Sequence, residues 1–177
     1  MSKAWELVDV AMGKAPADLV IRAATLVDVY SRELCPRRTI SIKGSRIASV
    51  GDFEPLVSSQ TQVIDADRFY ACPGLIDGHI HIESSLLEPI EFARAVIPRG
   101  TTAVMIDPHE IANVLGVEGI RLMLKRTENI PLKVYVQAPS CVPSTVNLET
   151  SGARIGPKEV AMMLKWSRII GLGEVMN

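Results

Sequence analysis

The sequence predicts an α/β protein in which a short helix and a β-rich section precede the front half of a (β/α)8 barrel. Residues 18–71 contain several apolar runs of strand length, whereas patterns of strands and helices alternate from residue 75 onward. A Pro-Gly pair at 73–74 separates the two sections. Four strands joined by three helices imply right-handed βαβ units and a parallel sheet. That arrangement makes up half of an eight-stranded barrel.

The first 16 residues are expected to form an N-terminal amphipathic helix. Trp5, Val8 and Met12 recur at helical spacing, and Lys14-Ala-Pro16 ends the pattern. We expect this helix to dock on another surface.

The section from 17 to 72 is predicted to be a β domain. Its expected strands cover residues 19–21, 25–29, 39–42, 46–50, 63–64 and 69–70, with a loop from 52 to 62. The Lys43-Gly44-Ser45 segment is typical of a hairpin turn.

The section from 73 to 177 is predicted to carry strands one to four of the barrel. Strands are expected from Leu75 into the histidine motif and at 101–106, 132–136 and 169–174, with helices at 88–97, 111–125 and 157–166. Pro157 occupies the first position of the last helix, where proline is favoured.

Composition excludes several functional classes. Nineteen basic and twenty acidic residues leave a net charge of −1, so nothing favours a nucleic acid or an anionic membrane as partner. Three widely spaced cysteines argue against a disulfide framework and favour a reducing compartment. With no signal-peptide pattern and no bilayer-length apolar run, we expect a cytoplasmic protein.

The Asp77-Gly-His79-Ile-His81 segment is the candidate metal site. Residues two apart on a strand face the same side, so Asp77, His79 and His81 are expected to share one face. Two imidazoles at the carboxyl end of a parallel strand can close on one divalent cation. Surface histidines are the alternative, but the preceding Pro-Gly turn and apolar strand favour metal ligands.

These residues also carry a family resemblance. Pro73-Gly-Leu-Ile-Asp-Gly-His-Ile-His81 resembles the signature of the amidohydrolase superfamily, whose members are metal-dependent hydrolases on a TIM-type barrel. The preceding section resembles the small β-sandwich domain that many members place before the barrel. The resemblance implies an incomplete β-sandwich at 17–72 and barrel strands one to four at 73–177.

Within that superfamily the sequence is most similar to the bacterial adenine deaminase family. The similar segments are residues 81–86, 100–116, 139–143 and 171–177. The resemblance implies purine salvage by hydrolytic deamination of adenine to hypoxanthine and ammonia, with two divalent metal ions (Mn, Fe or Zn) as cofactors.

The resemblance also implies roles for individual residues. His79 and His81 match the ligands of the first metal, and Glu174 matches the catalytic carboxylate that bridges the two metals. An ordinary acidic residue at a strand end is the alternative for Glu174.

Further polar residues follow the first two strands of the predicted barrel. Asp107, His109 and Glu110 can hold a further metal, shape the purine pocket, or cap the next helix. Glu83 and Ser84 can contact substrate or orient a ligand, or they can simply satisfy the backbone of their own loop.

The later metal ligands and the proton-shuttling aspartate of the family have no counterpart in this sequence. We therefore expect a homo-oligomer, or a barrel completed by a further polypeptide segment. Another amidohydrolase of the cyclic amidase or dihydroorotase type, and a non-catalytic metal-binding or assembly partner, are the alternative functions.

Overall fold

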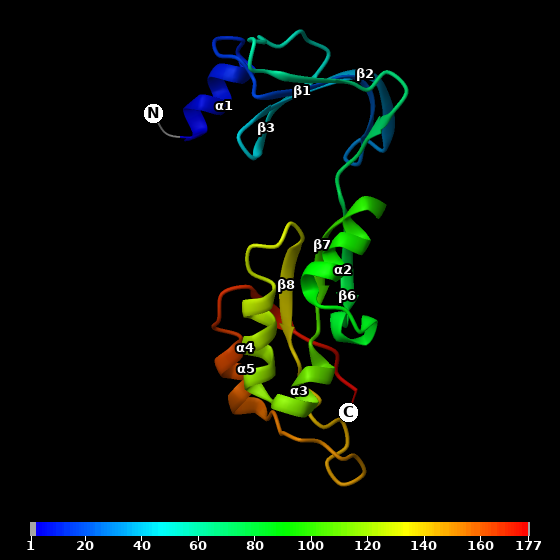
Figure 1. The fold of residues 1–177 in the computed structure, drawn as a ribbon, viewed down its shortest axis with the longest axis vertical. Helices are drawn as coiled ribbons and strands as arrows, with labels where there is room; N and C mark the ends of the chain where they lie inside the picture. Colours follow the sequence, from blue (N-terminus) through cyan, green and yellow to red (C-terminus); the bar gives the residue numbers. More distant parts are fainter. Residues whose placement is uncertain (1–2, 177) are drawn as a thin grey trace. The chain divides into compact units, whose positions relative to one another are not determined.

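The computed structural model describes residues 3–176, and it divides into two compact units, Met1–Pro73 and Gly74–Asn177 (Figure 1). Residues 1, 2 and 177, at the outer ends of the predicted helical and barrel segments, lie outside the described residues. No helix within residues 3–176 has the length and apolar content needed to cross a membrane.

The first unit contains one helix and one five-stranded sheet. Its elements are α1 (Lys3–Ala11), β1 (Leu19–Asp28), β2 (Glu33–Lys43), β3 (Arg46–Gly51), β4 (Gln62–Asp65) and β5 (Tyr70–Ala71). The strand order is β3-β2-β1-β4, and β5 also pairs with β1. Strands β1, β2 and β3 are antiparallel neighbours, whereas β4 and β5 run parallel to β1. Within the described residues this unit has a single sheet.

Strand β1 merges two strands that the sequence predicts separately. The expected strands at 19–21 and 25–29 are one continuous element with an irregular register between Ile21 and Ala24. Ala23 at that point has a positive φ of 60°. Such a bulge inserts a residue into the strand without ending it, which is why the apolar pattern looks interrupted.

Helix α1 forms as predicted and packs through Val10. Trp5, Val8 and Met12 are all exposed, whereas Val10 is buried with Ala17 and Val20. The helix lies against β3 (Figure 1). The helix therefore docks on the sheet as expected, and it does so through Val10 and not through the three side chains that mark the helical spacing.

The second unit is built from alternating strands and helices around a four-stranded parallel sheet. The sheet order, β6-β7-β8-β9, follows the chain. The strands are β6 (Leu75–Ile80), β7 (Thr101–Ile106), β8 (Lys133–Ala138) and β9 (Ile169–Leu172). The helices are η1 (Ile82–Ser85), α2 (Pro89–Val96), η2 (Ile97–Arg99), α3 (His109–Leu115), α4 (Val117–Arg126) and α5 (Pro157–Met163).

The core of this unit lies between the sheet and its helices. Fully buried Ile106 of β7 and Val136 of β8 pack in one cluster with Ile120 of α4 and Met163 of α5. Burying an aliphatic side chain of this size contributes about 1.5–3 kcal/mol. The second unit thus has a parallel sheet packed against helices, and the histidine motif lies at the carboxyl end of its first strand.

Three predicted boundaries in this unit were wrong. The helix expected at 111–125 is two helices, because Gly116 between them has φ 60° and ψ −138°. Helix α5 ends at Met163 rather than at residue 166. Strand β9 ends at Leu172, so Glu174 lies beyond the strand instead of within it.

Candidate metal centre

Three predicted ligands come together at the carboxyl end of the second unit's sheet. His79 lies in β6, His81 follows that strand directly, and Glu174 follows β9. One ligand atom from each side chain lies within 4.8 Å of the other two, and within residues 3–176 no other set of three acidic, histidine or cysteine residues meets this condition. Residues nearly a hundred positions apart in the sequence therefore form one cluster.

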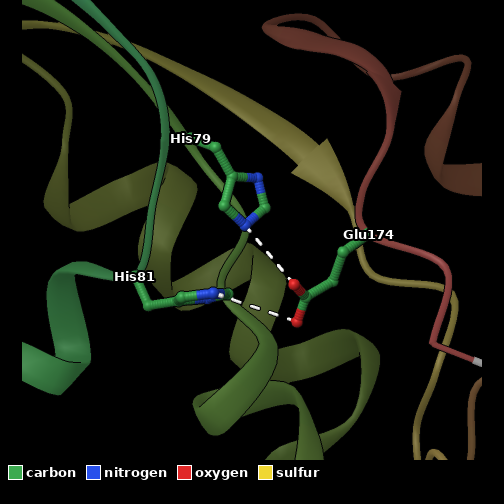
Figure 2. Close-up of side chains that lie close together, drawn as sticks. All are labelled: His79, His81 and Glu174. Carbon is green, nitrogen blue, oxygen red and sulfur yellow. Dashed lines mark ion pairs between the residues drawn. The ribbon is translucent and has the colours of Figure 1, made fainter.

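The geometry of the cluster suits a cation between the side chains. Figure 2 shows both imidazoles turned toward the Glu174 carboxylate, with His79 Nε2 at 3.6 Å from Oε2 and His81 Nε2 at 3.9 Å from Oε1. These distances are long for direct hydrogen bonds. Two ligands at about 2.1 Å from one metal ion can lie up to about 4.2 Å apart, so both pairs fit a shared cation.

The second nitrogen of each imidazole already has a partner. His79 Nδ1 lies 3.0 Å from Gln137 Oε1, and His81 Nδ1 lies 2.6 Å from the main-chain oxygen of Asp107. Both partners accept hydrogen bonds, so they place the ring proton on Nδ1 and leave the Nε2 lone pair for a metal. The donor set of two nitrogens and a carboxylate fits a divalent transition metal.

Asp77 shares the motif but not the cluster. Its carboxylate accepts a hydrogen bond of 3.1 Å from the main-chain N–H of His79. The register of β6 against β7 is irregular between Asp77 and Ile80. Simple alternation along a strand is therefore disturbed at this point.

Asp107 follows β7 and is completely buried. Its Oδ2 accepts a hydrogen bond of 2.8 Å from the main-chain N–H of Glu174, and its Oδ1 has no hydrogen-bond partner. Burial raises the pKa of this carboxyl group, although the Glu174 N–H works in the opposite direction. Asp107 makes no side-chain cap on α3.

Glu83 takes the capping position instead. From η1 its Oε1 accepts a hydrogen bond of 3.3 Å from the N–H of Ile111 in the first turn of α3. Ser84 donates its hydroxyl hydrogen bond to Glu110 Oε1, so η1 and α3 are linked by two side chains. Burial raises the pKa of Glu83, and the adjacent Glu110 carboxylate adds to that rise.

Glu110 connects this linkage to the histidines. Its Oε2 lies 3.5 Å from His81 Nδ1. Burial works to raise the pKa of Glu110, but the Ser84 hydroxyl and the charge of His81 outweigh it and lower the pKa. Burial likewise works against charged His81, but the Asp107 carbonyl and the Glu110 carboxylate outweigh it and raise the imidazole pKa.

His109 begins α3 close to the same cluster. Its ring centroid lies 6.4 Å from that of His81, and its Nδ1 is buried without a hydrogen-bond partner. Within residues 3–176, five buried side-chain polar atoms lack a partner, and four of them surround this region: Glu83 Oε2, Asp107 Oδ1, His109 Nδ1 and Glu110 Oε2. An unsatisfied buried polar atom costs about 1–3 kcal/mol. Their concentration indicates where a bound group would find ligands.

Gln137 and Ser140 are site residues that the sequence analysis missed. Gln137 orients His79, and the Ser140 hydroxyl donates a hydrogen bond of 2.8 Å to the main-chain oxygen of Glu174. Gln137 is polar at the carboxyl end of an otherwise largely apolar strand, β8. Together with the barrel prediction, that position was the available signal.

Together, the parallel sheet and the two histidines with a carboxylate at its carboxyl end form a candidate metal site in a mixed α/β protein. The amidohydrolase family pattern matches residues 70–165, and the chain belongs to this family. The predicted resemblance to adenine deaminases is confirmed. The chain is 53% identical over 172 residues to the adenine deaminase of Moorella thermoacetica and 52% identical over 172 residues to adenine deaminase 3 of Rhizobium meliloti. Each alignment covers 97% of this chain and 29% of the relative, so the chain spans about three tenths of their length.

Solved structures show the same fold. A Xaa-Pro dipeptidase with bound methionine matches with a TM-score of 0.55 and 16% identity, over 80% of this chain and 40% of that one. A mutant atrazine chlorohydrolase from Arthrobacter aurescens, complexed with zinc and atraton, matches with a TM-score of 0.51 and 22% identity, over 69% and 36%. The chain therefore shares the mixed α/β fold of these proteins, over 40% and 36% of their lengths.

Proposed function

We propose that this chain supplies the N-terminal part of an enzyme that deaminates adenine hydrolytically to hypoxanthine and ammonia, as part of purine salvage. The observation that carries the proposal is the convergence of His79, His81 and Glu174 on one point at the carboxyl end of the sheet. Relatives about half identical over 97% of the chain are adenine deaminases, which supports this substrate over others in the family.

In this proposal His79 and His81 would hold a divalent cation through Nε2, and the Glu174 carboxylate would be a further ligand of the two-metal centre that the family resemblance implies. Manganese, iron and zinc all suit this donor set. When bound, such cations lower the pKa of a water molecule so that it can attack the amino-bearing carbon at neutral pH. Glu174 is thus both metal ligand and catalytic residue.

The neighbouring polar residues are proposed to line the pocket that binds the purine. Glu83, His109 and Glu110 lie near His81 and each carries a buried polar atom without a partner, and the Ser84 hydroxyl donates to Glu110 beside them. Such atoms can hydrogen-bond the ring nitrogens and amino group of a purine. The donors of Asp107, His109 and Glu110 do not form a ligand cluster of the kind seen at His79, so a role in binding substrate is favoured over a further metal.

The remaining architecture is also a proposal. We assign residues 1–16 to an N-terminal helix, 17–72 to an incomplete β-sandwich, and 73–177 to strands one to four of a TIM-type barrel. The coverage of the relatives supports completion of both domains by a further polypeptide segment or by another copy in a homo-oligomer. The three widely spaced cysteines, Cys35, Cys72 and Cys141, favour a reducing compartment, so action in the cytoplasm is part of the proposal.

The direct test uses this chain together with the polypeptide segment that completes its barrel. Metal content and the conversion of adenine to hypoxanthine are measured for the wild type and for Glu174→Gln. The amide removes the charge that holds the cations, so affinity should fall about tenfold or more, and turnover should fall with it. Glu118→Gln is the matched control, because Glu118 is an exposed residue of α4 paired only with Arg121 among the ion pairs. Normal metal content and turnover in Glu174→Gln would contradict the assignment.

Substrate choice needs a separate assay. Adenine and dihydroorotate should be assayed separately with the same preparation. A cyclic amidase would open the ring of dihydroorotate and release no ammonia from adenine. Ammonia release from adenine is the expected result. Metal binding without turnover of either compound would instead favour a non-catalytic assembly partner.

A further inference from the structure

Glu174 is held in place by contacts that no strand provides. Strand β9 ends at Leu172, so the sheet's hydrogen-bond ladder stops before the carboxylate is reached. Gly173 still donates a main-chain hydrogen bond of 2.8 Å to Ala138. Beyond it, the Glu174 N–H is bound by the Asp107 carboxylate and the Glu174 carbonyl by the Ser140 hydroxyl, each at 2.8 Å. Side chains from the ends of β7 and β8 therefore fix this segment.

The Asp107 carboxylate fills the space beside Gly173. A Cβ added to Gly173 would lie 2.2 Å from Asp107 Oδ2 and 2.7 Å from its Cγ, closer than real Cβ atoms approach other atoms. Gly173 is not among the glycines with positive φ. The constraint on this position is therefore the volume of the carboxylate and not the conformation of the backbone.

Asp107 also contacts His81, on the other side of the metal-ligand cluster. The main-chain oxygen of Asp107 lies 2.6 Å from His81 Nδ1, and its own N–H donates a 3.0 Å hydrogen bond to Ile80, beside His81. Asp107 thus meets His81 through its backbone and Glu174 through its side chain. It is completely buried, so water does not compete for either contact.

We propose that Asp107 is a positioning residue that ties two metal ligands together: its carbonyl orients the His81 ring and its carboxylate sets the place of Glu174. The proposal deepens the proposed function and rests on His81 and Glu174 binding a cation. Partners of this kind, behind the ligands, typically affect metal affinity 10–100-fold.

The first experiment measures Zn²⁺ affinity of the 177-residue chain by competition with a chromophoric chelator, for wild type, Asp107→Asn and Asp107→Ala. The asparagine side-chain oxygen can still accept the Glu174 N–H, so its affinity should stay within about threefold of wild type. The alanine variant loses that acceptor and should bind about 10–100-fold more weakly. If Asp107 were itself a metal ligand, both substitutions would remove its charge and lower Zn²⁺ affinity. An equal loss of affinity in Asp107→Asn and Asp107→Ala would therefore overturn the proposal.

The second experiment tests the contact with Gly173. Gly173→Ala should weaken Zn²⁺ binding by displacing the carboxylate, yet add little in the Asp107→Ala background, where the space is empty. Such non-additivity is expected of residues in direct contact. Independent losses that simply multiply would show that Gly173 acts without Asp107.

The control variant separates positioning from general stability. Thr127→Val removes a buried hydroxyl that donates to Met123 and accepts from Arg168, outside the metal cluster. It should lower thermal stability and leave Zn²⁺ affinity unchanged. Hydrogen exchange of the Glu174 amide, measured without metal, should speed up about tenfold or more in Asp107→Ala and stay slow in Thr127→Val. Unchanged exchange in Asp107→Ala would overturn the proposal.

The two proposals can fail separately. A chain that binds Zn²⁺ with the expected Asp107 pattern, within a polypeptide that does not convert adenine, would reject the substrate assignment alone. Wild-type chain that takes up no Zn²⁺ would overturn the role of Asp107 as well.

Discussion

Gln137 and His79 belong to strands that are not neighbours, yet Gln137 Oε1 lies 3.0 Å from His79 Nδ1 across the end of β7. The amide oxygen accepts the ring proton at Nδ1, so the contact fixes both the tautomer and the tilt of the imidazole. His79 therefore presents Nε2 toward Glu174 without rearrangement. The third strand thereby contributes to the centre, although it supplies no ligand.

Replacing Gln137 with leucine should weaken divalent metal binding by about 10–100-fold, because His79 loses the partner that sets its proton. Gln137→Glu keeps an acceptor at the same place and is the matched control, with affinity equal to or above wild type. Titration with Co²⁺, followed by its visible absorption, measures both. Equal weakening by leucine and glutamate would mean that the amide acts through its shape and not as an acceptor.

Much of the candidate cluster could be predicted from the parallel topology together with the family resemblance. Parallel strands bring their carboxyl ends to the same edge of the sheet, and the resemblance singled out His79, His81 and Glu174 at that edge. Neither the topology nor the resemblance needs the details of packing. The three residues lie close together even though β9 is shorter than expected, Glu174 lies in the loop after it, and the register of β6 is irregular between Asp77 and Ile80.

The supporting contacts could not be predicted from the sequence in the same way. The Asp107 carboxylate binds a main-chain N–H that is 67 positions away, and the volume it occupies is visible only beside Gly173. The residue through which α1 docks could not be predicted for a related reason: periodicity marks which residues are apolar, but tertiary packing buries Val10 and leaves Trp5 exposed.

The break between α3 and α4 offers a test of backbone conformation. Gly116 has φ 60° and ψ −138°, and a Cβ there would lie 3.0 Å from the Ala153 Cβ. Gly116→Ala should therefore lower the free energy of unfolding of the second unit by about 1–3 kcal/mol. Urea unfolding followed by Trp166 fluorescence, in a Trp5→Phe background, reports on this unit because Trp166 packs against its core.

Gly171→Ala is the control for that substitution. Gly171 has no positive φ and no atom lies within 4 Å of an added Cβ, so alanine should change stability by no more than about 1 kcal/mol. If both variants unfolded at the same urea concentration, the left-handed turn at Gly116 would not be what divides the two helices.

The hairpin between β2 and β3 predicts a dependence on pH in the first unit. Asp18 accepts hydrogen bonds of 2.6 Å from Lys43 Nζ and 2.8 Å from the Gly44 N–H. The Lys43 contact, followed by the Gly44 contact, lowers the pKa of Asp18 below its usual value. A lowered folded-state pKa means that the stabilisation is complete above the unfolded-chain pKa of about 3.9 and is lost as the pH falls through the folded value.

Lys43→Met should therefore raise the pKa of Asp18 toward, but not fully to, its usual value, because the Gly44 N–H remains. Carbon-detected NMR titration of the side-chain carboxyl measures this directly. Asp28 is the internal reference: its pKa is lowered by the N–H groups of Tyr30 and Ser31 in its own turn, so it should titrate identically in both proteins. An Asp18 titration unchanged by the substitution would show that the Gly44 N–H alone holds the carboxylate charged, and the acid sensitivity of the hairpin would then be independent of Lys43.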